Sequence, residues 1–167
     1  MDLHFHWIVR HDMPAVLDIE RDSYAFPWSE AEFLDALLER GRVGIVAKSD
    51  RSVVGFLLYN SRPRSLEIVN LAVAADLRRR GIGSRLVDFL KEKLSSGGRD
   101  ELTVCVSDDS LGAQLFLRSQ KFRATAVLRD YFDEHEGDAY LMRYRLDCRV
   151  PTPRRHNRLS RYFDMEV

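Results

Sequence analysis

The sequence predicts one α/β domain in which about four helices flank a mixed, largely antiparallel and twisted sheet of about seven strands. Hydrophobic residues make up 45% of the 167 residues, enough for one core. Apolar residues recur with the strand period in some segments and with the helix period in others. Short turns join some neighbouring strands and helices join others, so both antiparallel and parallel strand pairs are expected.

The first strand is expected over residues 3–9, which are rich in aromatic and β-branched side chains. Asp12 is placed to cap the helix that follows, and Pro14 fits the first turn of that helix. Residues 25–28 contain Pro27 and break the helix. The chain therefore opens with a strand and a helix, followed by an irregular segment.

A second helix is predicted directly after this break. The segment 29–32 reads Ser-Glu-Ala-Glu and forms a capping box, with Trp28 and Phe33 placed as a hydrophobic staple. Two β-branched apolar runs follow at 43–48 and 53–59, and the polar turn between them indicates a hairpin.

The next predicted pair is a strand over 66–74 and an amphipathic helix that begins at the glycines of segment 81–83. Its apolar residues recur at helical spacing, and the segment 95–98, Ser-Ser-Gly-Gly, ends it. The next strand is predicted at 102–106.

The last elements are a helix capped within 108–110, a strand over 122–128, a polar loop over 130–137 and a strand over 138–146. Periodicity is lost from Cys148 onward. We therefore expect one domain over residues 1–147 and a C-terminal tail over 148–167.

Charge and composition exclude several classes of protein. The chain has 26 basic (Lys and Arg) and 26 acidic residues, so binding to nucleic acid by bulk charge is not expected, although the tail carries several arginines. No apolar stretch is long enough to span a bilayer, and we expect no membrane partner. Cys105 and Cys148 are too few for a disulfide scaffold, which favours a cytoplasmic location. Neither they nor the histidines have the spacing of a metal site.

The strongest functional signal is the loop 78–84, Arg-Arg-Arg-Gly-Ile-Gly-Ser, which lies between a strand and an amphipathic helix. The unpaired amides at a helix N-terminus suit a phosphate group, and glycines let it approach the main chain closely. The arginines add positive charge. The dinucleotide pattern G-x-G-x-x-G is not met, because Leu86 stands at its third glycine.

This loop and the strand before it, 67–73, resemble the acetyl-CoA-binding motif R-x-x-G-x-G of the GNAT superfamily of N-acetyltransferases. Within that superfamily, segment 25–30 is similar to the substrate loop of the RimI-like ribosomal-protein-alanine N-acetyltransferases. Tyr131-Phe132 and the segment 137–142 are similar to the tyrosine-rich loop and following strand of protein N-terminal acetyltransferases. The resemblance extends from Trp7 to about Leu146 and implies the GNAT fold.

The resemblance also implies how acetyl-CoA would be held, as a co-substrate without a metal ion. The pantetheine arm would bond the main chain of the strand, and the pyrophosphate would rest on the amides of the loop. The expected cofactor-binding residues are Leu71, Ala72, Val73, Arg78, Arg79, Arg80, Gly81, Ile82, Gly83, Ser84 and Ser110. The expected substrate-binding residues are Phe26, Trp28, Tyr131 and Tyr140, although strand alternation favours a structural role for Tyr140.

Glu67 is the first candidate for the catalytic base. An apolar strand would desolvate its carboxyl group and raise its pKa towards a useful value. Its place in the strand matches the glutamate that is the general base in histone-type members of the superfamily. The alternative is a surface carboxylate that pairs with Arg62 or Arg64.

The sequence departs from the RimI-like pattern at three positions. Cys105 replaces the catalytic glutamate, Leu117 replaces the proton-donating tyrosine, and Ser110 replaces an asparagine that contacts coenzyme A. Tyr131 is the candidate substitute for the lost tyrosine, because its hydroxyl could protonate a thiolate; the alternative is a ring packed under its loop. A small core residue is favoured for Cys105 over a nucleophile paired with His135.

The function that the resemblance implies is transfer of an acetyl group from acetyl-CoA to a primary amine, with the N-terminal α-amine of a protein such as a ribosomal protein as the favoured acceptor. Two alternatives stay open at this point. One is an acetyltransferase for a small-molecule amine, and the other is a non-catalytic acyl-CoA-binding regulatory domain. The second is motivated by the replacement of reactive side chains at Cys105 and Leu117.

Overall fold

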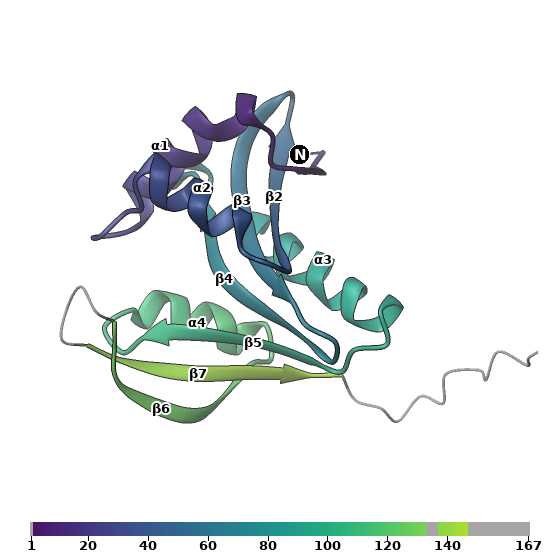
Figure 1. The fold of residues 1–167 in the computed structure, drawn as a ribbon, viewed down its shortest axis with the longest axis vertical. Helices are drawn as coiled ribbons and strands as arrows, with labels where there is room; N and C mark the ends of the chain where they lie inside the picture. Colours follow the sequence, from purple (N-terminus) through teal and green to yellow (C-terminus); the bar gives the residue numbers. More distant parts are fainter. Residues whose placement is uncertain (1, 133–136, 147–167) are drawn as a thin grey trace, which may run out of the picture.

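A twisted sheet with helices on both faces forms the centre of the computed structural model, which describes residues 2–132 and 137–146 (Figure 1). Within these ranges the sheet has seven strands in the order β1-β2-β3-β4-β5-β7-β6. The strands are β1 (His4–Trp7), β2 (Arg42–Ser49), β3 (Ser52–Ser61), β4 (Ser65–Val73), β5 (Glu101–Ser107), β6 (Arg123–Phe132) and β7 (Gly137–Arg145). The helices are α1 (Met13–Ser23), α2 (Glu30–Leu38), α3 (Ile82–Ser96) and α4 (Leu111–Ser119).

The predicted fold class is confirmed, including its mixture of strand directions. Strands β4 and β5, which α3 connects, are the parallel pair, and the other described pairs are antiparallel. Segments 133–136 and 147–167 lie outside the described residues, and with them His135, Cys148 and the predicted tail.

Two apolar clusters hold the helices to the two faces of the sheet. On one face the apolar stripe of α3, including Leu86 and Leu90, packs with Leu117 of α4 against the sheet. On the other face α1 and α2 cover β2, β3 and β4 through a cluster that includes Val16 and Phe33. Both α3 stripe residues are fully buried, as their helical spacing predicts.

The predicted capping box at the start of α2 is confirmed. Ser29 Oγ accepts a hydrogen bond from the Glu32 amide at 3.3 Å, and Glu32 Oε2 accepts from the Ser29 amide at 2.7 Å. The staple residues Trp28 and Phe33 meet edge to face with ring centroids 5.9 Å apart. This start fixes where the segment between α1 and α2 approaches the sheet.

Asp12 is the N-cap residue of α1, as the sequence predicts, but its side chain makes no capping hydrogen bond to the helix. Asp12 is 2% exposed, and its carboxylate accepts from the Val9 amide at 3.3 Å and forms an ion pair with Lys48 of β2 at 2.6 Å. A short 3-10 turn over 10–12 precedes the helix and turns this side chain inward. Asp12 therefore ties the start of α1 to the sheet.

The prediction that a polar loop begins at residue 130 is wrong, because β6 continues to Phe132. Asp138 of β7 makes the longer strand favourable: it pairs with Arg129 and accepts a hydrogen bond from the Asp130 amide at 3.2 Å. The register of β6 and β7 shifts here, and Asp130 has a φ of 48°, which aspartate tolerates. Tyr131 consequently lies in a strand.

A β-bulge at Val69 interrupts the alternation of β4. Leu58 of β3 pairs with Asn70, whereas the next residue, Tyr59, pairs with Ile68, so Val69 has no partner opposite it. Ile68 belongs to the cluster under α3, but Ala72 belongs to the cluster under α1. The bulge thus turns the even-numbered residues of β4 from one face of the sheet to the other.

The pairing of β4 with β5 ends at the same place. The last paired residues are Ile68 and Val104, whereas β4 continues to Val73 and β5 to Ser107. Figure 1 shows the two strands together at one end and apart at the other. Within the described residues, one edge of β4 is therefore left without a neighbouring strand from Val69 onward.

Because Asp12 is buried, we expect Lys48→Met to lower the free energy of unfolding by about 3–5 kcal/mol, as the carboxylate would lose its cation. Chemical denaturation at neutral pH measures this. Arg64→Met is the control: the Arg64 side chain is 88% exposed and its Nη2 lies 3.8 Å from the Asp100 carboxylate, so a loss of less than about 1 kcal/mol is expected. Equal losses in the two variants would contradict the assigned role of Asp12.

Candidate active site

A cavity of about 480 Å³ occupies the space where β4 and β5 part. We call it the reaction groove. Its walls come from the end of α1 and the segment after it, from β4 and β5, and from the start of α4. Four residues that the sequence predicted for binding line it: Phe26, Trp28, Leu71 and Ser110. The parting of the strands therefore brings together segments that are far apart in the sequence.

The open edge of β4 contributes main-chain groups to the reaction groove. Leu71 O accepts a hydrogen bond from the Tyr24 hydroxyl at 2.8 Å, and Val73 O accepts from Arg78 Nε at 3.0 Å. Because main-chain groups alternate along a strand, the amides of Leu71 and Val73 point to this edge as well, and those of Ala72 point to β3. This is the geometry that a ligand lying along β4 requires.

The Tyr24 hydroxyl is a stable hydrogen-bond donor to Leu71 O. Desolvation, followed by the nearby charge of Glu20, raises the pKa of the Tyr24 hydroxyl far above its usual value. The hydroxyl stays protonated at neutral pH and keeps its bond to Leu71. The end of α1 is thereby attached to the edge of β4.

The glycine loop begins α3 with its amides free of intrahelical partners. Gly81 is the N-cap residue with a φ of 84°, and Arg79 has a φ of 63°. The amides of the first turn, Ile82, Gly83 and Ser84, have no carbonyl before them in the helix. A Cβ on Gly83 would lie 3.3 Å from the Phe116 ring of α4. Because Gly83 has no side chain, the start of α3 can lie this close to α4.

Some side chains of this loop make contacts within the protein, and others are exposed to solvent. Arg78 donates to Val73 O, to the Ser23 hydroxyl at 2.8 Å and to Asp22 O at 3.3 Å, so it fastens the end of α1 to β4. Arg79 and Arg80 are exposed. The Ile82 side chain is buried in the core, and Ser84 Oγ accepts from Gln120 Nε2 at 3.0 Å.

Tyr131 reaches the reaction groove through Cys105. A hydrogen bond with the Cys105 thiol, then burial, then the charges of Cys105 and Glu67 raise the pKa of the Tyr131 hydroxyl to about 12. Cys105 is half-buried and lines the groove, so the prediction of a small core residue is wrong: the parting of β4 and β5 leaves its side chain open to the cavity.

Glu67 does not have the raised pKa that the sequence predicted. Burial alone would raise it, but hydrogen bonds from Asn60 at 3.0 Å and Arg62 at 2.7 Å, and the charges of Arg62 and Arg42, lower the pKa of Glu67 below its usual value. The alternative interpretation, a carboxylate paired with Arg62, is what the structure shows. Glu67 stays ionised at neutral pH and is near enough to influence Tyr131.

Tyr140 and Leu117, two positions that the family resemblance singled out, pack with the core cluster under α3. Tyr140 of β7 packs against the cluster under α3 and is absent from the lining of the reaction groove, which agrees with the structural role that its strand alternation favours. Leu117 is 5% exposed and lines the groove from α4 with an apolar surface. The position where RimI-like proteins have a tyrosine therefore offers no hydroxyl here.

Sequence reasoning missed Glu20 and Asn70, which both line the reaction groove and are hydrogen-bonded to each other at 2.9 Å. Glu20 lies on the buried stripe of α1, four residues after Val16. A carboxylate at a position that the helical period assigns to the core was the available signal. The sequence around Asn70 contains no comparable signal, because the bulge at Val69 determines on which face of β4 its side chain lies.

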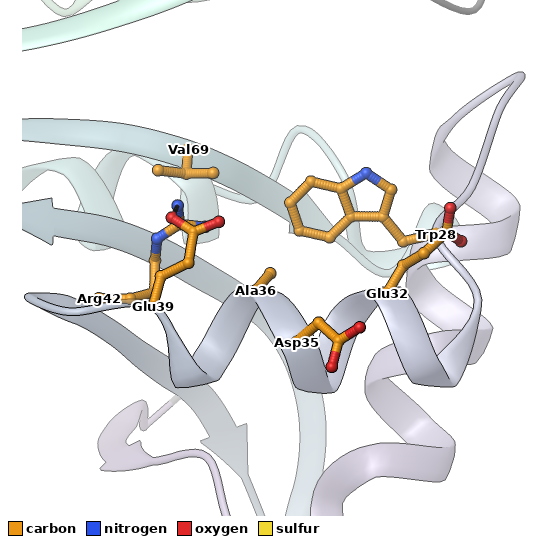
Figure 2. A pocket seen from close by; sticks show the side chains of 7 residues that line it. All are labelled: Trp28, Glu32, Asp35, Ala36, Glu39, Arg42 and Val69. Atoms are coloured by element: carbon orange, nitrogen blue, oxygen red, sulfur yellow. Dashed lines mark hydrogen bonds and ion pairs between the residues drawn. The ribbon is translucent and has the colours of Figure 1, made fainter.

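A second cavity, of about 490 Å³, adjoins the reaction groove and shares Trp28 and Val69 with it. Figure 2 shows the indole of Trp28 and Val69 on one side of this cavity. Glu32 and Asp35 of α2 lie on the other side, and Glu39 and Arg42, which are paired, close its end. A cavity with acidic side chains from α2 therefore lies next to the reaction groove.

Among residues 2–132 and 137–146, no three His, Cys, Asp or Glu side chains gather in a way that could hold a metal ion. No helix within the described part of the chain is both long and apolar enough to cross a membrane.

The fold, the glycine loop and the parted strands define a class of enzyme, and comparison with known families agrees. Residues 13–122 match the model of the acetyltransferase (GNAT) family. The chain belongs to this family of acetyltransferases, which use acetyl-CoA.

Two curated relatives and one solved structure illustrate the similarity. The chain is 29% identical over 133 residues to the [ribosomal protein bS18]-alanine N-acetyltransferase of Salmonella typhimurium, which covers 78% of the chain and 89% of that protein. It is 26% identical over 144 residues to an N-alpha-acetyltransferase of Saccharolobus solfataricus, with 78% and 86% covered. The crystal structure of Arabidopsis thaliana NAA60 with acetyl-CoA superposes with a TM-score of 0.74 at 18% identity, covering 87% of this chain and all (100%) of that one.

The backbone of Gly81 sets the start of α3, and we expect Gly81→Ala to lower the free energy of unfolding by about 1–2 kcal/mol, because a Cβ is unfavourable at positive φ. A Cβ would meet nothing within 4 Å there, so the effect isolates the backbone. Gly112→Ala, in the first turn of α4 and also in open space, is expected to be neutral or stabilising. Chemical denaturation of both variants checks this; equal effects would contradict it.

Proposed function

We propose that this acetyltransferase transfers the acetyl group of acetyl-CoA to the N-terminal α-amine of a protein. The observation that supports the proposal is the reaction groove, which is lined by Leu71 from the open edge of β4 and by Cys105, the hydrogen-bond partner of Tyr131, and which has a second cavity beside it along α2. The open edge of β4 thus offers a surface for acetyl-CoA, and the cavity along α2 offers space for an extended substrate.

Acetyl-CoA supplies a thioester when it is bound. We propose that the exposed amides of Leu71 and Val73 bind its pantetheine arm and that the first-turn amides of Gly83 and Ser84 bind its pyrophosphate. Arg79 and Arg80, which are exposed, add positive charge for further phosphates. Arg78 is committed to α1 and β4, so its role is to hold the walls of the groove.

In the reaction the amine nitrogen forms a bond to the acetyl carbon, the carbon–sulfur bond breaks, the amine loses a proton and the sulfur gains one. Tyr131 is protonated at neutral pH because its pKa is about 12, so it can donate to the departing sulfur. Glu67 is ionised, and its lowered pKa makes it a weak base. We assign it the lesser task of attracting the ammonium ion and accepting its proton through water.

Two observations support a peptide rather than a small amine. The second cavity shares Trp28 and Val69 with the reaction groove, so we propose that a substrate whose amine is in the groove extends past these two residues along α2. The relative from Salmonella typhimurium is named for an alanine of ribosomal protein bS18, which favours a protein substrate, and a ribosomal protein is one candidate. The carboxylates of Glu32 and Asp35 favour a substrate with a further positive charge.

The proposal is tested with acetyl-CoA, a panel of hexapeptides with free α-amines and a matched panel of small amines, polyamines included. We expect turnover on peptides, a lower KM where a lysine or arginine follows the first residue, and none on α-acetylated peptides. Turnover confined to small amines would assign the enzyme to the alternative substrate class. Calorimetric binding of coenzyme A without turnover on either panel would instead support a non-catalytic acyl-CoA-binding domain.

The roles of Tyr131 and Glu67 predict different losses of activity. We expect Tyr131→Phe to lower kcat by about 100-fold or more, because the departing sulfur would lose its proton donor. Glu67→Gln should lower kcat/KM by a smaller factor. Steady-state kinetics on the best peptide measures both.

Tyr144→Phe is the matched control, because this tyrosine packs on Phe122 in the core, with ring centroids 5.9 Å apart. Its kinetics should equal those of the wild type. A Tyr131→Phe enzyme with unchanged kcat would remove Tyr131 from the mechanism.

A further inference from the structure

Glu20 is a buried carboxylate that the mechanism above does not use. It is 2% exposed on α1, and each of its oxygens accepts one hydrogen bond: Oε1 from the Trp28 amide at 3.1 Å and Oε2 from Asn70 Nδ2 at 2.9 Å. Burial raises its pKa, and these two hydrogen bonds oppose the rise. Both of its oxygens are thus committed, one to the substrate loop and one to β4.

Asn70 has the complementary feature, a buried acceptor without a donor. Its side chain is 7% exposed, and Oδ1 is one of two buried polar side-chain atoms in the described part of the chain that have no hydrogen-bond partner. Turning the amide over would set Oδ1 against the Glu20 carboxylate, so Glu20 fixes its orientation. The acceptor is therefore held in place by its neighbour.

The location of this acceptor indicates what it serves. Asn70 and Glu20 both line the reaction groove, and Asn70 follows the bulge that parts β4 from β5. After the bulge, Ala72 faces α1 and α2, whereas Leu71 and Val73 pack towards α3. Asn70 is hydrogen-bonded to Glu20 of α1, and its buried acceptor lacks the N–H partner that an incoming amine can supply.

We propose that Asn70 Oδ1 accepts a hydrogen bond from the substrate amine and that Glu20 is a positioning residue that keeps this amide oriented. The inference rests on the proposed function and names a binding contact of that site. One N–H of the amine bonds to Asn70, which restrains the nitrogen so that its lone pair can point to the acetyl carbon. The covalent step itself is unchanged.

A reversal of the hydrogen-bond polarity tests this. In Glu20→Gln, the new amide oxygen keeps the Trp28 hydrogen bond, and the new NH₂ group donates to Asn70. The Asn70 amide then turns over and presents its own NH₂ group to the amine. We expect kcat/KM for the peptide to fall about tenfold or more, while the KM for acetyl-CoA and the melting temperature stay near wild type.

A second substitution should restore the acceptor. In Glu20→Gln combined with Asn70→Asp, the new NH₂ group donates to one oxygen of the new carboxylate, and the other oxygen faces the groove. We expect kcat/KM for the peptide to recover to within a few-fold of wild type. A merely structural role for the buried carboxylate would not give recovery by this exchange.

The remaining outcomes overturn the inference. Unchanged peptide kinetics in Glu20→Gln would mean that Oδ1 binds only water, and an increase confined to the KM for acetyl-CoA would assign it to the cofactor. A loss that follows the melting temperature, or one that the double variant does not reverse, would make the pair structural. The proposed function survives these results as long as the wild type acetylates peptides. A wild type without amine turnover would remove both.

Discussion

The β-bulge at Val69 is the constraint on which the candidate site depends. One extra residue in β4 shifts its register against β3, and the hydrogen bonding to β5 stops at the neighbouring Ile68. The carbonyls of Leu71 and Val73 then have side-chain donors instead of a strand beside them. A regular strand would have extended the pairing and filled the space that the reaction groove occupies.

The end of α1 holds this opening in shape. Tyr24 reaches the carbonyl of Leu71, Arg78 reaches back to Ser23, and Glu20 connects the Trp28 amide to Asn70. Each bond joins α1 or the segment after it to β4 or to the loop before α3. Because these donors and acceptors come from different elements, the walls of the groove are set by tertiary contacts and not by any one segment.

The chemistry of this groove differs from that implied by the RimI-like resemblance. A carboxylate is expected where Cys105 stands, and a tyrosine where Leu117 stands, so the general acid that we propose, Tyr131, comes from another element. Tyr131 lies near the end of β6, where its hydroxyl is hydrogen-bonded to the Cys105 thiol. Glu67 accepts hydrogen bonds from Asn60 and Arg62, which lower its pKa, so it is a weaker base than the sequence predicted.

The sequence by itself determined the order of elements, the capping box at Ser29 and the glycine loop, because propensity, periodicity and caps act within a few residues. Tertiary structure decided what depends on contacts between distant segments. Lys48 draws Asp12 away from its helix, Asp138 extends β6, and the bulge places Asn70 beside Glu20. A pKa such as that of Glu67 depends on neighbours that only the folded sheet brings together, and no local pattern contains them.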